Sequence, residues 1–268
     1  MHKFEYLTMP LKSDYIIVYF FGLATIGLVI GVACLVIPRL WLFLANVYKM
    51  YVEYTPIIYP KEDCLSPVSK SRLNLVARKT LVLDMDETMI TSWLTKSGKK
   101  PKNKPRIAHD FKFYLPAYEA TIYVYKRPYL DHFLDRVSKW YDLTVFTAGA
   151  EIYASPILDF LDRGRGILNS RLYRQDCIEM YGTRGKSVLL ASPDLANVLL
   201  LDNSSTECSF NAGNAILIKS YEIGSRDEEL INLLPFLDAL RFMKDVRSVL
   251  KRCTRFEFFS TILESAAQ

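Results

Sequence analysis

The chain has 268 residues, half of them hydrophobic, and a formal net charge of +5. This length allows one sizeable domain with an extension and excludes two large domains. The small, spread positive charge does not indicate a nucleic-acid binder, and the five scattered cysteines and three histidines predict neither a disulfide framework nor a zinc site.

The first element is an apolar segment, Ile16–Ile37, which holds no charged residue over 22 positions. About 20 apolar residues suffice to cross a bilayer, so the segment predicts a retained membrane helix. A secretory signal has a shorter apolar core and a small-residue cleavage site, and a mitochondrial transit peptide is rich in arginine, so this N-terminus fits neither. The aromatic-rich segment 40–54 is expected at the membrane surface, and Pro38 leaves a hairpin or re-entrant arrangement open.

Residues 1–54 are therefore expected to form a membrane anchor and interfacial segment, and 55–71, with three prolines, a linker. A folded domain is predicted from 72 to 254, followed by a loosely held tail at 255–268. The positive charges that flank the apolar segment are nearly balanced, so the positive-inside rule scarcely decides the orientation of the helix.

The chemistry is expected in the stretch KTLVLDMDETMI at 79–90. Leu81–Leu83 has the character of a strand buried on both faces, and the acids begin where it ends. In an open parallel sheet ligands bind beyond the carboxyl ends of the strands, so Asp84 and Asp86 are expected to face a substrate crevice. The structural alternative is a helix cap at Asp86 or Thr88.

Two further apolar runs end in polar residues: LTVFT reaches Thr147, and VLLLDN reaches Asp202 and Asn203. Three parallel strands would deliver these side chains and the first two aspartates to one edge of a sheet. Two carboxylates about 4 Å apart repel by about 4 kcal/mol at an effective dielectric near 20, so the cluster is tolerable only around a cation. Oxygen ligands alone suit Mg²⁺, which is therefore the expected cofactor.

The region after the first strand carries six basic side chains between Lys96 and Arg106. A solvated hairpin tip is one interpretation, and a flap that attracts an acidic substrate or a lipid surface is the other. Alternating apolar residues at 111–115 and 122–124 predict two strands of this flap.

Helices are predicted from Pro128 to about Trp140 and over Glu151–Arg163, each with an apolar face. Residues 167–190 are expected to form short strand-like pieces, and Ala215–Lys219 a last strand. A short closing helix is expected over Asp245–Arg252.

Near the C-terminus, Ser225 and Glu228 form a capping-box pattern, which predicts the start of a helix. Pro235 lacks a backbone N–H and should kink or end that helix.

Four of these stretches together resemble the motifs of the haloacid dehalogenase-like phosphatases: LDMDET, VFTAG, the isolated Lys186 and LLLDNS. More narrowly, YKRPYLDHFL, FTAGAEIY, LYRQDC and NLLPFLDALR are similar to the FCP/SCP branch, which dephosphorylates protein serines and threonines. Within it the chain most resembles the Dullard-like nuclear envelope phosphatases, from about 65 to 252. The resemblance implies an α/β fold: a Rossmann-like parallel sheet flanked by helices, with a β flap and a small antiparallel insertion.

The resemblance also implies a role for each candidate site residue. Asp84 attacks phosphorus and becomes an aspartyl-phosphate, and Asp86 acts first as general acid and then as general base. Asp84, the backbone carbonyl of Asp86 and Asn203 hold Mg²⁺, while Asp202 orients Lys186 and a metal-bound water. The phosphate-binding positions that it implies are Thr88, Thr147, Arg174 and Lys186.

Three further positions bear on the pocket and on how closely the family pattern is followed. Tyr153 is implied to line the substrate pocket, and packing is the alternative role for this aromatic residue. The chain has Gly149 where the family generally has serine, and Ser205 where it generally has proline. Residues 182–190 match poorly around the lysine, which concerns substrate preference more than the chemistry.

The function that the resemblance implies is a membrane-anchored, magnesium-dependent protein serine/threonine phosphatase of the endoplasmic reticulum or nuclear envelope, with its catalytic domain in the cytosol or nucleoplasm. The implied partners are a phosphoserine or phosphothreonine protein, with lipin as one candidate, and a small membrane regulatory subunit; no nucleic-acid partner is expected. Two alternatives stay open: a non-catalytic interaction module on the same fold, as in a mitochondrial translocase subunit, and a phosphatase of small metabolites. The intact Asp84 and Asp86 argue against the first alternative, and the lack of an obvious large cap domain against the second.

Overall fold

The structure is a computed structural model, and it describes residues 22–29, 31–33, 37–44, 65–96, 105, 107–180 and 182–253. The chain divides into two units, Met1–Pro56 and Ile57–Gln268, and each is described by itself. In the first unit, the helix Gly22–Leu44 has 23 residues, and an 18-residue window within it has a mean hydropathy of 2.3; it alone among the described helices is long and apolar enough to cross a membrane. It runs past Pro38, where the sequence left a break open. A signal sequence passes the same test, so the anchor stays a prediction.

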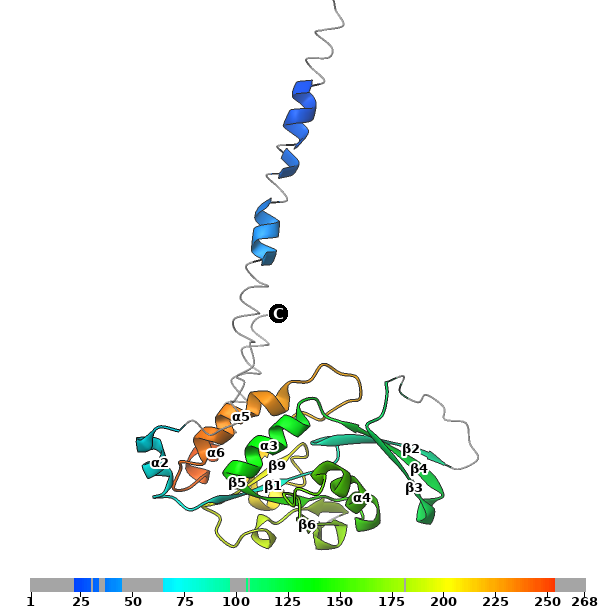
Figure 1. The fold of residues 1–268 in the computed structure, drawn as a ribbon, viewed down its shortest axis with the longest axis vertical. Helices are drawn as coiled ribbons and strands as arrows, with labels where there is room; N and C mark the ends of the chain where they lie inside the picture. The colour runs from blue at the N-terminus through cyan, green and yellow to red at the C-terminus, as the bar shows by residue number, and fades with distance from the viewer. Residues whose placement is uncertain are drawn as a thin grey trace, which may run out of the picture. The chain divides into compact units, whose positions relative to one another are not determined.

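A five-stranded parallel sheet forms the centre of the second unit, in the order β10-β9-β1-β5-β6 (Figure 1). β1 pairs in parallel with both β5 and β9, and Leu81 lies opposite Leu143 and Leu199. This topology confirms the predicted Rossmann-like sheet. The strands are β1 (Lys79–Leu83), β5 (Tyr141–Phe146), β6 (Ser170–Leu172), β9 (Val198–Asp202) and β10 (Ala215–Leu217).

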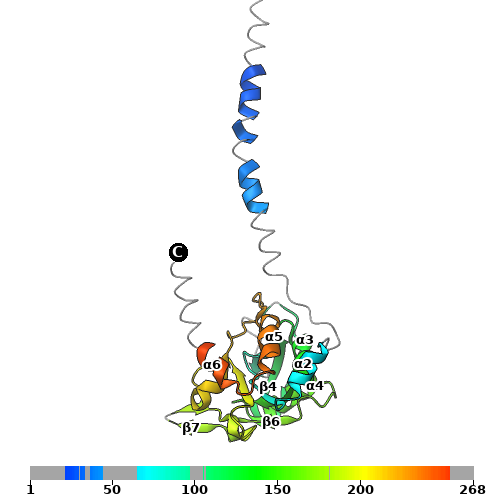
Figure 2. The ribbon, with the colours of Figure 1, turned by 90° about the vertical axis from the view of Figure 1, so that its left-hand side faces the viewer.

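Both faces of the sheet are covered, which explains the uninterrupted apolar runs in the sequence. Leu81 and Leu83 belong to the larger core, which the helices share, whereas Val82 belongs to a smaller core on the other face. Figure 2 shows α3 and α5 on one side of the domain and the β7 strand on the other. The helices are α3 (Leu130–Trp140), α4 (Glu151–Asp162), α5 (Glu229–Leu240) and α6 (Arg247–Cys253).

A flap of three antiparallel strands follows β1, in the order β2-β4-β3. It consists of β2 (Ile90–Lys96), β3 (Phe111–Leu115) and β4 (Ala120–Lys126), and Figure 1 shows it extending away from the parallel sheet. β3 and β4 are the two predicted strands, and β2 is a third, which its threonine and serine residues conceal in the sequence. Between Lys96 and Pro105 the basic run lies outside the described residues.

The flap is joined to the rest of the domain through α4. The Phe111 and Phe160 rings stack with centroids 4.6 Å apart. Stacked aromatic pairs stabilise a contact by about 0.5–1.5 kcal/mol beyond their buried area, so this pair helps to hold the flap against α4.

The predicted linker, 55–71, is helical near its end, and its residues 55–64 lie outside the described ones. α2 (Pro67–Leu73) begins with Ser66 as its N-cap, whose hydroxyl accepts a hydrogen bond from the N–H of Ser69. Proline at the first helical position also favours the start of a helix. The backbone N–H at this position has no acceptor within a helix, so no hydrogen bond is lost when proline lacks it.

The predicted antiparallel insertion, 167–190, is divided between two sheets. β6 joins the edge of the parallel sheet by pairing with β5. Only β7 (Ile178–Met180) and β8 (Thr183–Gly185) form an antiparallel pair.

The last long helix, α5, differs from the prediction at both ends. It starts at Glu229 without a capping box, because the Ser225 hydroxyl donates to the carbonyl oxygen of Glu222 instead. It also continues through Pro235 to Leu240. One missing backbone hydrogen bond is outweighed here by burial of Leu234, Leu237 and Leu240, since a fully buried leucine contributes about 1.5–3 kcal/mol.

Candidate active site

Four predicted site residues lie at the carboxyl edge of the parallel sheet. Asp84 directly follows β1, Thr147 directly follows β5, and Asp202 ends β9 with Asn203 after it. The backbone N–H groups of Asp84 and Thr147 donate to carbonyls of the adjacent strands β9 and β6, so both residues continue the sheet hydrogen bonding by one position. Their places are therefore set by the backbone of the sheet.

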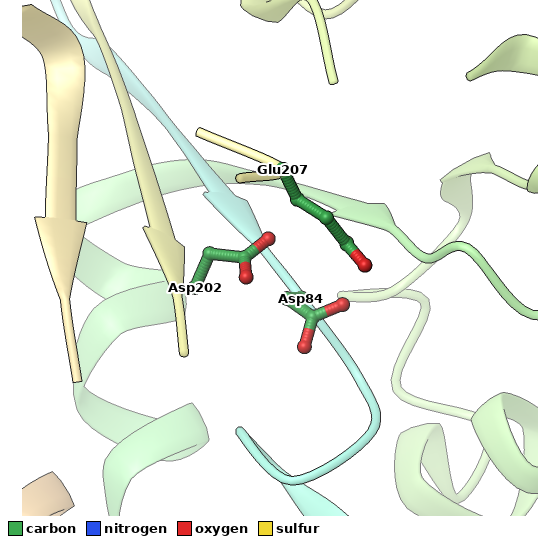
Figure 3. A group of neighbouring side chains, drawn as sticks. All are labelled: Asp84, Asp202 and Glu207. Atoms are coloured by element: carbon green, nitrogen blue, oxygen red, sulfur yellow. The ribbon is translucent and has the colours of Figure 1, made fainter. Parts of the chain in front are cut away.

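Lys186 is the centre of a buried ion cluster beneath this edge. Its Nζ lies 2.6 Å from Asp84 Oδ1, 2.7 Å from Asp202 Oδ2 and 2.6 Å from Glu207 Oε2. Figure 3 shows the three carboxylates converging from two strand ends and a separate segment. The lysine itself is fully buried. The ammonium group donates hydrogen bonds to Asp84 and Asp202, and Glu207 completes the cluster as a third ion-pair partner.

The three carboxylates could hold a metal ion by their spacing, since their oxygens lie within 4.8 Å of one another. The ammonium group of Lys186, however, already fills the space that they share. A divalent ion would have to use other oxygens of the pocket, which Asp84, Asp86 and Asn203 line together.

Negative charge exceeds what the protein neutralises at this edge. Burial raises the pKa of Asp84 to about 7, although the charge of Lys186 opposes the shift. Burial likewise raises the pKa of Asp86 to about 6. For Lys186, burial lowers the pKa, but the surrounding carboxylates outweigh burial and raise it, so the lysine stays charged. The two carboxyl groups that line the pocket are thus the ones that a further cation would stabilise as carboxylates.

Asp86 accepts a hydrogen bond from Tyr153 in the first turn of α4. The Tyr153 Oη lies 2.5 Å from Asp86 Oδ1 and 2.8 Å from the Oγ of Ser92 on β2. Burial and the charge of Asp86 raise the pKa of the phenol, which therefore stays protonated. Its single hydrogen goes to the carboxylate, and the serine hydroxyl donates to the phenol in turn. This chain of hydrogen bonds fixes the Asp86 side chain from the flap and from α4.

Gly149 leaves room for this tyrosine. A Cβ atom at this position would lie 3.1 Å from both the Tyr153 ring and Thr147 Oγ1. The Gly149 N–H also donates to Thr147 Oγ1 at 2.9 Å. A serine at position 149 would crowd the Tyr153 ring. Glycine at this position therefore allows Tyr153 to pack closely against the loop after β5.

A pocket of about 370 Å³ opens at this edge of the sheet. Two arginines contribute positive charge to it: Arg174, whose Nε donates to the Ala148 carbonyl at 2.8 Å, and Arg184 on β8. The described lining includes no histidine or cysteine, so its donors are oxygen atoms, which suit a hard cation. The lining residues are Asp84, Asp86, Glu87, Thr147, Ala148, Gly149, Tyr153, Arg174, Arg184, Asn203, Ser204 and Glu207.

Thr88 lies beneath the pocket and does not line it. Its buried hydroxyl donates to Asn203 Oδ1 at 3.2 Å. The Asn203 Nδ2 donates to the Oγ of Ser220 at 2.9 Å, so the amide is held from both sides. Thr88 therefore orients Asn203, which leaves the amide oxygen with one lone pair for a cation.

The loop that carries Asp86 is anchored from below by Arg127. This arginine is fully buried and pairs with Asp227 through two bonds, Nη2–Oδ2 at 2.7 Å and Nε–Oδ1 at 2.9 Å. It also donates to the Thr88 carbonyl at 3.1 Å. Within the same loop Glu87 has a φ of 58°, a left-handed conformation that is uncommon for residues other than glycine. Arg127 thus stabilises a loop conformation that the backbone preference of Glu87 does not favour.

The family model of the NLI interacting factor-like phosphatases matches residues 79–247 of this chain. The chain belongs to this family. The matched region includes the parallel sheet, the flap and the pocket, and the phosphatase is accordingly a hydrolase that acts on phosphoproteins.

Relatives of this phosphatase support the same family. It is 44% identical over 226 residues to the CTD nuclear envelope phosphatase 1 homolog of Drosophila melanogaster, covering 81% of this chain and 91% of the relative. It is 42% identical over 220 residues to the CTD nuclear envelope phosphatase 1 of Xenopus laevis, covering 80% and 89%. Among solved structures, fission yeast Fcp1 bound to beryllium fluoride is 20% identical, covers 72% of this chain and 59% of that one, and has a TM-score of 0.45.

The pocket of the phosphatase brings together most of the predicted site residues. Lys186 and Asp202 lie directly beneath it, and Thr88 lies under Asn203. Those that line it are Asp84, Asp86, Thr147, Tyr153, Arg174 and Asn203.

Arg184 and Glu207 are among the pocket residues that are absent from the sequence-based prediction. Arg184 lies two positions before Lys186, and this spacing, which puts alternate residues of an extended segment on one side, is a signal that could have found it. Glu207 lies in a turn after β9, and nothing in its neighbourhood in the sequence indicates a contact with Lys186.

Proposed function

We propose that this chain is a membrane-anchored, magnesium-dependent protein serine/threonine phosphatase with Asp84 as its nucleophile. The observation that carries the proposal is the ion pair between Asp84 Oδ1 and Lys186 Nζ at 2.6 Å. Lys186 is fixed in turn by Asp202 at 2.7 Å. One oxygen of Asp84 is thereby held, and Asp84 lines the pocket together with Asp86.

In the first step, a carboxylate oxygen of Asp84 attacks phosphorus, and the bond between phosphorus and the serine or threonine oxygen breaks. Asp86 gives its proton to the departing oxygen, a role that its raised pKa of about 6 favours near neutral pH. The products are the free hydroxyl group of the substrate and an aspartyl-phosphate on Asp84. Tyr153 holds Asp86 in place through its hydrogen bond.

In the second step, Asp86 takes a proton from a water molecule, whose oxygen attacks phosphorus. The bond between phosphorus and Asp84 breaks, which releases inorganic phosphate and restores the carboxylate. Arg174, Thr147 and Lys186 are placed to stabilise the phosphoryl oxygens, because they lie around or beneath the pocket.

The donor set at the pocket fits a magnesium ion, since it consists of oxygen atoms at an edge with excess negative charge. Asp84, the backbone carbonyl of Asp86 and Asn203 would hold the ion. When bound, Mg²⁺ would neutralise part of the charge on the phosphoryl group and on these carboxylates.

The proposed location is the nuclear envelope or endoplasmic reticulum membrane, with the catalytic domain in the cytosol or nucleoplasm. The names of the relatives and the apolar helix Gly22–Leu44 support it. The proposed substrates are phosphoserine and phosphothreonine proteins, with lipin-like regulators of lipid synthesis as the finer proposal. A small membrane regulatory subunit is the proposed partner.

Phosphopeptide dephosphorylation by the full-length protein in detergent tests the mechanism. Asp84→Asn should abolish turnover, because an amide cannot replace the carboxylate nucleophile, and labelled phosphate should be trapped on Asp84 in the wild type. Removal of divalent ions should stop the reaction, and added Mg²⁺ should restore it. The control is Asp142→Asn, an exposed aspartate of β5 paired with Arg78, which should leave activity unchanged. Full activity in Asp84→Asn would overturn the mechanism.

A further inference from the structure

The ammonium group of Lys186 is buried among three carboxylates in this structure. It donates hydrogen bonds to Asp84 at 2.6 Å and Asp202 at 2.7 Å, and Glu207 Oε2 forms an ion pair with it at 2.6 Å. A phosphoryl oxygen can therefore bind this lysine only if one carboxylate gives up its place.

Glu207 is the carboxylate that is able to leave. The side chains of Asp84 and Asp202 come from strand ends and are 6% and 0% exposed, whereas that of Glu207 is 25% exposed and lines the pocket. Displacement requires only a rotation of the side chain, because the Glu207 backbone is held separately: its carbonyl accepts a hydrogen bond from the Lys186 N–H at 2.8 Å. Among the described residues, Lys186 is the ion-pair partner of the Glu207 carboxylate.

Charge also favours an exchange at this position. A phosphoryl group that reaches Lys186 is anionic, and it would meet the like charge of Glu207 at the same lysine. Both groups offer an anionic oxygen to the same buried ammonium group, so they compete for one place beside it. Asp84, by contrast, has to stay because the proposed reaction takes place on it.

We propose that Glu207 is a displaceable ligand of Lys186, which occupies the place of a phosphoryl oxygen in the free enzyme and returns when phosphate leaves. The inference rests on the proposed function of the pocket. Because Glu207 must first be displaced, every phosphoryl group binds to the pocket more weakly, and by the same factor, than it would if this carboxylate were absent. The product phosphate has no contacts beyond the phosphoryl group itself, so Glu207 keeps the product from occupying the pocket, whereas a phosphopeptide also has its flanking residues to bind the pocket rim.

Binding of inorganic phosphate to the full-length protein, measured by calorimetry in detergent with Mg²⁺, tests this inference. Glu207→Gln removes the charge but keeps an oxygen of the same reach, so the dissociation constant for phosphate should fall about five- to tenfold. The inhibition constant of phosphate against a phosphopeptide should fall by the same factor. The matched control is Glu151→Gln, which removes an exposed carboxylate from the first turn of α4 outside the pocket lining and should change phosphate affinity less than about twofold.

Unchanged or weaker phosphate binding in Glu207→Gln would overturn the inference and leave Glu207 as a residue that only positions Lys186, with a loss in kcat as its signature. A structure of the wild type with inorganic phosphate gives a second test that does not depend on the variant folding. Glu207 should then lie beyond 4 Å from Lys186 Nζ, and an intact ion pair beside bound phosphate would disprove the exchange. Phosphate binding needs no turnover, so a failure of the Asp84 mechanism and a failure of this inference give different results.

Discussion

Asp86 has to give up a proton at one stage of the proposed reaction and take one at the next. The first stage matters most for a poor leaving group such as a serine alkoxide, and least for p-nitrophenolate. Asp86→Asn should therefore lower turnover of a phosphoserine peptide by about 10²–10⁴-fold and that of p-nitrophenyl phosphate by much less. Steady-state kinetics with both substrates measures the difference, and equal losses would contradict a role as general acid.

Tyr153 is a positioning residue by its geometry, because its hydroxyl reaches Asp86 at 2.5 Å. Tyr153→Phe keeps the ring and removes a hydrogen bond to a charged group, which contributes about 1.5–3 kcal/mol. The expected result is a kcat reduced by about 10-fold or more with KM nearly unchanged. A raised KM with unchanged kcat would instead show that Tyr153 contacts the substrate, as the family resemblance implies.

At the scale of elements, one buried ion pair connects the catalytic loop, β4 and the segment before α5. Removing one partner of a buried pair leaves an uncompensated charge, at a cost of about 3–5 kcal/mol. Asp227→Asn should thus lower the free energy of unfolding by that amount in urea titrations of the full-length protein. The neighbouring surface pair Arg226–Glu228 is the control: Arg226 is 81% exposed, so Arg226→Gln should cost less than about 1 kcal/mol. Equal effects of the two substitutions would contradict the anchoring role of Arg127.

The end of α4 depends on a single carboxylate. Asp162 accepts hydrogen bonds from the backbone N–H groups of Gly166 at 2.7 Å and Leu168 at 2.9 Å. Burial by itself would raise the pKa of Asp162, but these hydrogen bonds outweigh burial and hold the pKa below its ordinary value.

This lowered pKa makes the stability of the protein depend on pH. The carboxylate contributes fully above the pKa of an unfolded aspartate, about 3.9, and its contribution is lost as the pH falls toward the lower pKa of the folded state. Asp162→Asn should lower the free energy of unfolding at pH 7 by about 1–3 kcal/mol and by less at acidic pH. Urea midpoints at both pH values measure this, and a constant difference would show that the hydrogen bonds do not depend on the charge.

At the scale of the whole molecule, the apolar helix Gly22–Leu44 and the phosphatase domain are separate units, so the proposed anchor is testable without affecting the pocket. Carbonate extraction of microsomes should leave the protein in the membrane, because an apolar helix of 23 residues is long enough to span the bilayer. Added protease should digest the catalytic domain in intact microsomes. Release by carbonate would disprove the span, and protection from protease would disprove the orientation.

Much of the fold and part of the site could be predicted from neighbouring residues in the sequence. Leu81–Leu83 followed at once by Asp84 and Asp86 marks a buried strand and its acidic end, because a strand covered on both faces needs a continuous apolar run. The same reasoning holds for the strands before Thr147 and Asp202. Helix ends were less predictable: the capping pattern at Ser225 and the break at Pro235 are local preferences, which burial of α5 overrides.

The contacts at Lys186 are different in kind, because they join segments that the sequence separates by 16 to 102 positions. No local pattern shows that the turn holding Glu207 packs against β8, or that Tyr153 reaches Asp86 over a glycine. Such contacts arise when the sheet, the flap and the short antiparallel strands pack together. The type of one residue does not by itself determine which distant residue it contacts. The position of Asp84, the proposed nucleophile, at the end of its strand therefore follows from the order of residues in the chain, whereas the set of charges around it follows from packing.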